Sequence, residues 1–200
     1  MGEVYKARDT RLGRTVALKI IRKPDPEARR RFQREARAIS SLNHALICGL
    51  YDVGQQDGID YLVMEYLEGE TLAARLRKDP LPFPETLRIG AQIAEALDAA
   101  HRQNLVHRDL KPGNIMLTRS GIKLVVFGLS KSEALPQTAM GGSEPVATQT
   151  LLPTQAALTR VGTLLGTLEY MAPEQLEGRE SDARSDIFAL GGMLYEMASG

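Results

Sequence analysis

The 200-residue sequence has a single cysteine, no tryptophan and no excess of charge of either sign. One cysteine, Cys48, excludes a disulfide within the chain and suits a reducing compartment. Lysine plus arginine and aspartate plus glutamate number 25 each, so no net charge points to nucleic acid or an anionic membrane as a partner. No apolar run reaches the roughly 18 residues of a membrane segment, and no stretch resembles a signal peptide. We therefore expect a cytoplasmic globular chain without a membrane segment.

Strand patterns dominate the first 66 residues. Residues 3–9 and 15–21 are short runs with strand alternation, separated by a turn-prone stretch. Residues 60–67 form a longer apolar run that is typical of a buried strand. This part of the chain is expected to form a small sheet.

A helix is expected between these strands, over residues 25–42. Phe32, Ala36 and Ile39 have the spacing of one helix face, and Glu35 falls inside the same stripe. A carboxylate that faces inward needs a partner, which makes Glu35 a candidate functional residue. The alternative is a surface pair between Glu35 and one of the neighbouring arginines.

The remaining chain has mainly helical patterns. Residues 84–104 are expected to form a long amphipathic helix with Leu87, Gly90, Ala94 and Leu97 on its apolar face. A hairpin is expected next, because two short apolar runs bracket a Ser-Gly turn.

The last third of the sequence divides into a polar stretch and an apolar one. Residues 131–158 contain three charged residues and no aromatic residue, so they cannot bury much apolar surface and are expected to form a mobile loop. Residues 185–200 are nearly all apolar and are expected to form a buried helix.

The densest chemistry lies in the stretch HRDLKPGN, residues 107–114. Asp109 and Asn114 flank Lys111 there, so a proton acceptor, a metal ligand and a cation lie within one short loop. A short buried strand then leads into a Phe-Gly turn, where an acid is expected before the phenylalanine. Val126 occupies that position instead.

The motifs GEVYKA, VALK, Glu35, HRDLKPGN, FG, APE and SDIFALG occur in an order that resembles the protein kinase catalytic domain. The resemblance spans essentially the whole chain and is greatest to the bacterial, eukaryote-like serine/threonine kinases. It implies an α+β fold of two lobes. Residues 1–66 would form a small sheet lobe with one helix, and residues 67–200 a mainly helical lobe with residues 131–158 as a flexible activation-loop insert.

The resemblance also implies roles for individual residues, with ATP and Mg²⁺ as cofactors. Lys19 would hold the α- and β-phosphates and pair with Glu35, while Asp109 would accept the proton of the substrate hydroxyl. Lys111 would steady the γ-phosphate, and Asn114 would ligate one Mg²⁺. The positions expected to contact ATP are Gly2, Val4, Ala17, Lys19, Met64, Glu65, Leu67 and Met116.

Substrate type and regulation follow from the same resemblance. Lys111, and Thr167 placed to contact Asp109 and Lys111, indicate a serine or threonine acceptor on a protein substrate. Arg108 would be the cationic partner of a phosphorylated Thr163 or, failing that residue, Thr159. The phosphate would come from an upstream kinase or from a second copy of the chain.

Three departures from the family pattern qualify this expectation. Val126 stands where the family has the aspartate that links Mg²⁺ to the phosphates, and an isopropyl group cannot coordinate a cation that requires oxygen ligands. The chain begins inside the glycine-rich loop. It ends just after the central helix of the large lobe, without the later helices that would supply an arginine for Glu174 and cover that helix.

These departures leave three interpretations open. The chain is a serine/threonine kinase with severely weakened phosphoryl transfer, a pseudokinase that binds and regulates a partner, or a non-functional fragment. The survival of Asp109, Lys111, Asn114, Lys19 and Glu35 favours the first interpretation, and Val126 favours the second.

Overall fold

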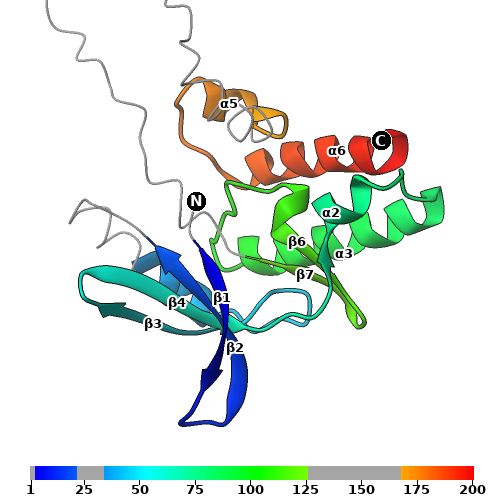
Figure 1. Ribbon diagram of the computed structural model, residues 1–200. Coiled ribbons are helices and arrows are strands. Elements are labelled where there is room, and N and C mark those ends of the chain that lie inside the picture. The colour runs from blue at the N-terminus through cyan, green and yellow to red at the C-terminus, as the bar shows by residue number, and fades with distance from the viewer. Residues whose placement is uncertain (1–2, 22–33, 126–167) are drawn as a thin grey trace, which may run out of the picture.

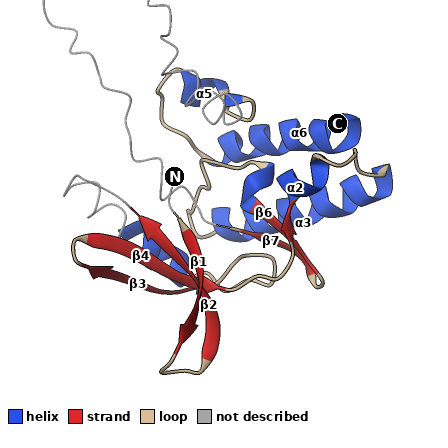
Figure 2. Cartoon of the chain, viewed as in Figure 1, coloured by secondary structure: helices blue, strands red, loops and turns tan. Residues whose placement is uncertain are grey.

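The structure is a computed structural model that describes residues 3–21, 34–125 and 168–200. An antiparallel sheet forms one part of the molecule, and a mainly helical region forms the other (Figure 1). Strands and helices are largely segregated between these two parts (Figure 2). The expected α+β architecture is therefore confirmed, while the domain limits given above stay a prediction.

The N-terminal sheet has four strands in the order β1-β2-β4-β3. Their bounds are β1 Val4–Asp9, β2 Arg14–Ile21, β3 Leu50–Gln56 and β4 Ile59–Glu65. Three of them lie where strands were expected, and all neighbours pair antiparallel. β3 was missed because it contains few apolar residues and has none of its residues fully buried.

The β3–β4 hairpin closes through Asp57 and Gly58, which have φ angles of 51° and 77°. An Asp-Gly pair is the usual sequence of a tight hairpin turn, since both central residues need positive φ. This dipeptide was the signal that could have located β3.

One face of the sheet shares a buried core with the helical residues 34–40. Ala17 and Met64 are register partners on the central strands, and both side chains are buried. Ala36 and Ile39 are also buried in the same core cluster, as their spacing predicted. Side chains alternate along a strand, so Lys19 lies on the same face as Ala17, toward the helical region.

Helices α3 (Phe83–His101) and α6 (Ala183–Ser199) lie side by side (Figure 1). The expected apolar face of α3 was partly wrong, because Leu87 is 55% exposed and Ala94 is exposed. Gly90 is buried, and a side chain there would meet Leu194 of α6. The buried residues of α3 are Thr86, Ile89, Gly90, Ile93, Ala96, Leu97 and Ala100.

α6 was expected to be a buried helix, and the structure confirms this for one of its faces only. Met193 and Met197 are buried, but Ile187, Phe188 and Tyr195 are 54%, 50% and 76% exposed. Apolar side chains of α6 therefore remain in contact with solvent on its other face. No helix in the described part of the chain is long and apolar enough to cross a membrane.

A second, three-stranded sheet lies in the helical region. Its order is β5-β6-β7, with bounds β5 Glu70–Thr71, β6 Ile115–Thr118 and β7 Gly121–Leu124. β6 and β7 form the expected hairpin. Shorter helical elements complete the region: α2 Leu72–Leu76, the 3-10 helix η1 Pro112–Asn114 and α5 Pro173–Leu176.

Candidate functional site

The loop from His107 to Asn114 is anchored by Asp186, a buried carboxylate on α6. Asp186 Oδ2 accepts from the His107 backbone N–H at 2.8 Å, and Oδ1 accepts from the Arg108 N–H at 2.9 Å. His101 Nε2 donates to Oδ2 at 2.7 Å. Buried carboxylates need several donors, and Asp186 has three. The loop and α6 are thereby fixed to each other.

Arg108 has a left-handed backbone with φ of 64°, an uncommon conformation for a residue with a side chain. Its carbonyl accepts from Gln175 Nε2 at 2.9 Å, while its N–H donates to Asp186. Hydrogen bonds on both sides therefore hold this strained turn in place. Strained residues of this kind cluster at functional sites.

His107 is completely buried beneath the loop. Burial lowers the pKa of its imidazole, and the nearby Asp186 carboxylate opposes this effect. A neutral ring fits the contacts, because Nδ1 accepts from the Asp109 N–H at 3.3 Å and Nε2 faces the Val125 carbonyl at 3.5 Å. His107 therefore joins the loop to the end of β7.

Asp109, Lys111 and Asn114 lie together at the surface of this loop. Lys111 Nζ is 3.0 Å from Asp109 Oδ2. Asn114 Nδ2 donates to the Asp109 carbonyl at 2.7 Å and approaches Oδ2 at 3.4 Å. The Asp109 side chain is only 11% exposed, and these donors help to orient its carboxylate. The structure brings together the three residues that the sequence singled out.

Lys19 projects from β2 into a partly buried position near this loop. Burial lowers the pKa of its ammonium, Asp109 raises it and Lys111 lowers it further. Within the described residues Lys19 makes no ion pair. A cation that is already partly buried and has no ion-pair partner can bind an anion with little further loss of hydration.

Glu35 pairs with Arg108 rather than with Lys19. Its Oε1 is 3.6 Å from Arg108 Nη1, and the two side chains are 34% and 47% exposed. The expected contact between Lys19 and Glu35 is not formed in this structure. The reason is the position of the helical residues 34–40, which places Glu35 against the loop.

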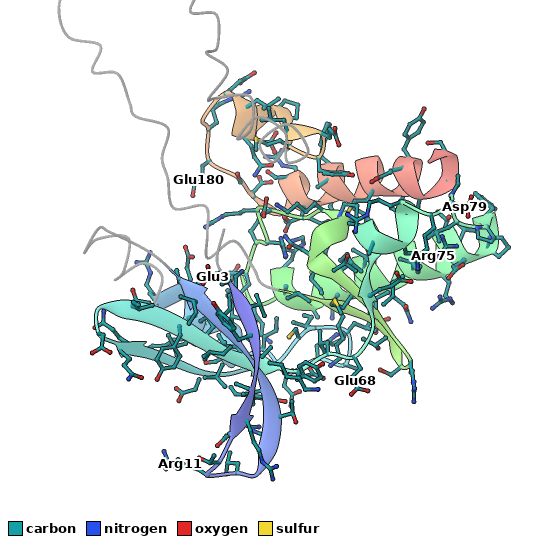
Figure 3. All side chains as sticks on the ribbon, in the orientation of Figure 1. Glu3, Arg11, Glu68, Arg75, Asp79 and Glu180 are labelled. Atoms are coloured by element: carbon teal, nitrogen blue, oxygen red, sulfur yellow. The ribbon has the colours of Figure 1, made fainter. Side chains whose placement is uncertain are left out.

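The residues expected to surround an adenine lie at the junction of the two regions. Ala17 and Met64 are buried, whereas Val4 is 59% exposed. Met116 lies partly buried on β6, and Leu67 is partly buried in the segment that follows β4. That segment continues to Glu68, which is labelled in Figure 3 where the chain passes from the sheet to the helical region.

The side chain of Glu65, at the end of β4, is held by other residues. Lys123 Nζ on β7 is 2.9 Å from Glu65 Oε2, and the Gly49 N–H donates to the same oxygen at 3.1 Å. Glu174, for which the family resemblance implies an arginine partner, accepts a hydrogen bond at Oε1 from the Ser185 hydroxyl. That bond lowers the pKa of Glu174.

Several predicted positions lie outside the described residues. They are Gly2, Phe32, Val126, residues 131–158, Thr159, Thr163 and Thr167.

No cluster of side chains among the described residues could hold a metal ion without the phosphates of a nucleotide. These residues contain no group of three or more histidine, cysteine, aspartate or glutamate side chains that could hold a metal ion. Asn114 offers a neutral amide oxygen, and Val126 offers no oxygen on its side chain. A hard divalent cation requires several oxygen ligands, of which carboxylates are the strongest.

The interpretation of the sequence gave no role to His101 or Lys123. His101 ends the amphipathic helix α3 one residue after the buried Ala100, and this position could have indicated a buried partner. Lys123 lies in a short strand and had no comparable signal.

Comparisons with known proteins bear on the whole chain. The family model described as "Protein kinase domain" matches residues 1–200. A probable serine/threonine-protein kinase of Streptomyces coelicolor is 43% identical over 98% of the chain, and PrkC of Bacillus subtilis is 40% identical over 100%. The chain spans 28% of the length of each of these two relatives.

Solved structures are also similar to this chain. The crystal structure of the Mycobacterium tuberculosis PknI kinase domain is 30% identical, with a TM-score of 0.74. The match covers 98% of this chain and 67% of that structure.

Proposed function

Because the chain belongs to the protein kinase family, we propose that it is a serine/threonine-protein kinase domain in which phosphoryl transfer is severely weakened. The observation that carries the proposal is the loop in which Asp109, Lys111 and Asn114 meet, combined with valine at position 126. The loop has the groups that the reaction needs on the acceptor side. On the nucleotide side, valine occupies position 126, where the family has an anionic metal ligand.

In the proposed reaction Asp109 accepts the proton of a serine or threonine hydroxyl as that oxygen attacks the γ-phosphate of ATP. The contacts from Lys111 and Asn114 orient the Asp109 carboxylate for this step. Lys111 also supplies positive charge beside the transferred group. Thr167 is assigned to the same acceptor side by resemblance to the family.

ATP would bind between the sheet and the helical region. Lys19 supplies a partly buried ammonium for the phosphates, and the buried Ala17 and Met64 supply apolar surface for the adenine. Val4, Met116 and the backbone of residues 65–67 would complete that contact, together with Gly2. Mg²⁺ would neutralise phosphate charge in an intact family site, but the residues present do not hold it in that way.

Regulation is proposed to act through Arg108. A phosphate on Thr163, or on Thr159, would add nearly two negative charges that a guanidinium can bind. The partner classes that follow are a protein substrate and an upstream kinase or second copy. The proposal places the domain in the cytoplasm, where ATP is available.

The test of the proposed function is the substitution Val126→Asp. It should give Mg²⁺-dependent ATP binding and raise autophosphorylation by about 10²–10³-fold, the usual effect of one preorganised electrostatic group. Without Mg²⁺ the added acid should lower stability, which separates metal binding from improved packing.

The matched control is Val126→Asn, which places a neutral amide of the same size at the same position. It should give much less Mg²⁺ dependence than the aspartate, because carboxylates are the stronger ligands for a hard cation. Equal ATP affinity and autophosphorylation for the unmodified chain and Val126→Asp would show that another group supplies the metal site.

A second candidate function is a pseudokinase that binds nucleotide without catalysis and regulates a partner. Two lysines near the proposed phosphate site, together with valine at position 126, favour metal-independent binding. Thermal shift with ATP separates the two functions. A shift that requires Mg²⁺ supports the kinase, and a shift of equal size without Mg²⁺ supports the binding module.

A further inference from the structure

An ion pair between Lys123 and Glu65 connects the two parts of the molecule. Lys123 lies on β7 in the helical region, and Glu65 ends β4 of the N-terminal sheet. The Nζ and Oε2 atoms are 2.9 Å apart, with the side chains 15% and 29% exposed. Both side chains are therefore largely shielded from water. Each charge depends on the other for compensation, because solvent cannot fully replace the ion pair.

The pair belongs to a network of backbone bonds among three segments. The segment that precedes β3 is docked on β7, because the Cys48 N–H donates to the Leu124 carbonyl at 2.9 Å and the Leu124 N–H donates to the Leu46 carbonyl at 2.8 Å. Lys123 Nζ also approaches the Ile47 carbonyl at 3.5 Å. Lys123 thus lies where this segment, β7 and Glu65 meet.

Glu65 is restrained on its backbone as well as on its side chain. Its N–H donates to the Gly49 carbonyl at 2.8 Å, and the Gly49 N–H donates back to Glu65 Oε2 at 3.1 Å. The Cys48 thiol lies 3.7 Å from the Glu65 carbonyl. Loss of the Lys123 ammonium would leave the carboxylate with one backbone donor, and the carboxylate would turn toward water. Such a rotation would disturb the bond to Gly49 and hence the path of the backbone at residue 65.

We propose that Lys123 is a positioning residue for adenine recognition. It fixes Glu65 so that the backbone of residues 65–67 presents its N–H and carbonyl groups at a constant angle to the adenine edge. Lys123 does not touch the nucleotide. This inference rests on the proposed function, specifically on adenine binding beside residues 65–67.

The same strand also positions the opposite end of the site. Val125 follows β7 directly, and its N–H donates to the Asn114 carbonyl at 2.8 Å. The polypeptide from Lys123 to Val125 therefore joins the adenine side to the loop of Asp109. A change at Lys123 should act on the adenine side first, because Val125 keeps its own backbone bond.

The test compares binding of adenosine and of tripolyphosphate to the full 200-residue chain. Lys123→Met keeps the aliphatic stem and removes the charge. We expect its adenosine affinity to fall by up to roughly tenfold, because the charged hydrogen bond that is lost sets an upper limit on the effect at the adenine edge, with tripolyphosphate affinity unchanged. Lys123→Arg should restore adenosine affinity. Glu65→Gln, which keeps an acceptor for Gly49, should reproduce the loss, and combining it with Lys123→Met should add nothing.

Lys78→Met is the matched control. Lys78 pairs with Glu70 at the same 2.9 Å, but the two side chains are 62% and 40% exposed. It should leave both affinities unchanged. Equal adenosine affinity for Lys123→Met and the unmodified chain would overturn the inference alone, as would parallel losses for adenosine and tripolyphosphate. Failure of the unmodified chain to bind adenosine would overturn the proposed function and this inference together.

Discussion

The carboxylate of Glu35 lies 3.6 Å from the guanidinium of Arg108, and it makes no ion pair with Lys19. Both partners are partly exposed, so the pair contributes little stability. The helical residues 34–40 are therefore joined to the loop of Asp109 by a weak contact that a competing charge can replace. A phosphate on Thr163 would be such a competitor for Arg108.

The first prediction is a small coupling energy between Glu35 and Arg108. A double-mutant cycle of Glu35→Gln and Arg108→Gln, followed by urea unfolding, should give about 0.2–1 kcal/mol, decreasing as salt is added. The corresponding cycle of Glu35→Gln with Lys19→Met should give no coupling. A larger coupling energy in the second cycle would show that Glu35 pairs with Lys19 in solution.

The second prediction concerns Asp186. Asp186→Asn should lower the free energy of unfolding by about 3 kcal/mol, because an amide cannot accept from all three donors and leaves a buried N–H unpaired. The measurement is the urea midpoint. Asp98→Asn is the control, since Asp98 pairs with Arg102 while 59% exposed, and its midpoint should stay the same. Equal small effects of both changes would show that Asp186 does not hold the loop.

The third prediction uses two glycines. Gly69 has φ of 150°, and a Cβ there would lie 1.9 Å from the Leu117 backbone carbonyl oxygen. Gly69→Ala should therefore cost about 2–4 kcal/mol through strain and displacement of β6. Gly191→Ala is the counterpart on exposed α6, where a Cβ meets nothing, and it should stabilise the chain by about 0.5–1 kcal/mol. Thermal unfolding of both variants is the measurement. A stabilised Gly69→Ala together with a destabilised Gly191→Ala would contradict this prediction.

The fourth prediction is a loss of stability at alkaline pH that depends on Cys48. Burial, and then the Glu65 carboxylate, raise the pKa of the thiol to about 12. In the unfolded chain the thiol ionises near pH ~8.5. Its contribution to stability is thus complete below pH ~8.5 and is lost as pH rises toward the folded value.

Urea midpoints of the unmodified chain and Cys48→Ala, measured at increasing pH above neutrality, provide the test. As pH rises, the urea midpoint of the unmodified chain should fall relative to the midpoint of Cys48→Ala. Iodoacetamide should also modify Cys48 slowly in the native protein and quickly in urea, because the thiolate is the reacting form. Rapid native labelling would show that the thiol is not protected.

The sequence predicted the fold where periodicity was local. β1, β2 and β4 have clear strand patterns, and the β6–β7 hairpin has its turn residues. β3 was missed because an edge strand in contact with solvent needs no apolar alternation. The buried face of α3 was placed partly wrong, since its true face depends on the close approach of α6 at Gly90.

The site was predictable to the extent that its residues are adjacent in the sequence. Asp109, Lys111 and Asn114 lie in one loop, so their meeting required no knowledge of tertiary structure. The partner of Glu35 depends on where a whole helix lies, and no local pattern contains that information. Lys123 and Glu65 are 58 residues apart, and neither stood out in the sequence as half of an interaction.

The bonds from Asp186 to His107 and Arg108 also set an order of events during synthesis. Asp186 is 79 and 78 residues later in the chain than its two backbone donors. At the usual rate of translation the ribosome adds those residues in roughly 4–16 s. Throughout that interval the sequence of the Asp109 loop already exists without the carboxylate that fixes its shape. The hydrogen bonds that fix the loop can therefore form only after Asp186 has been made, seconds after the loop itself.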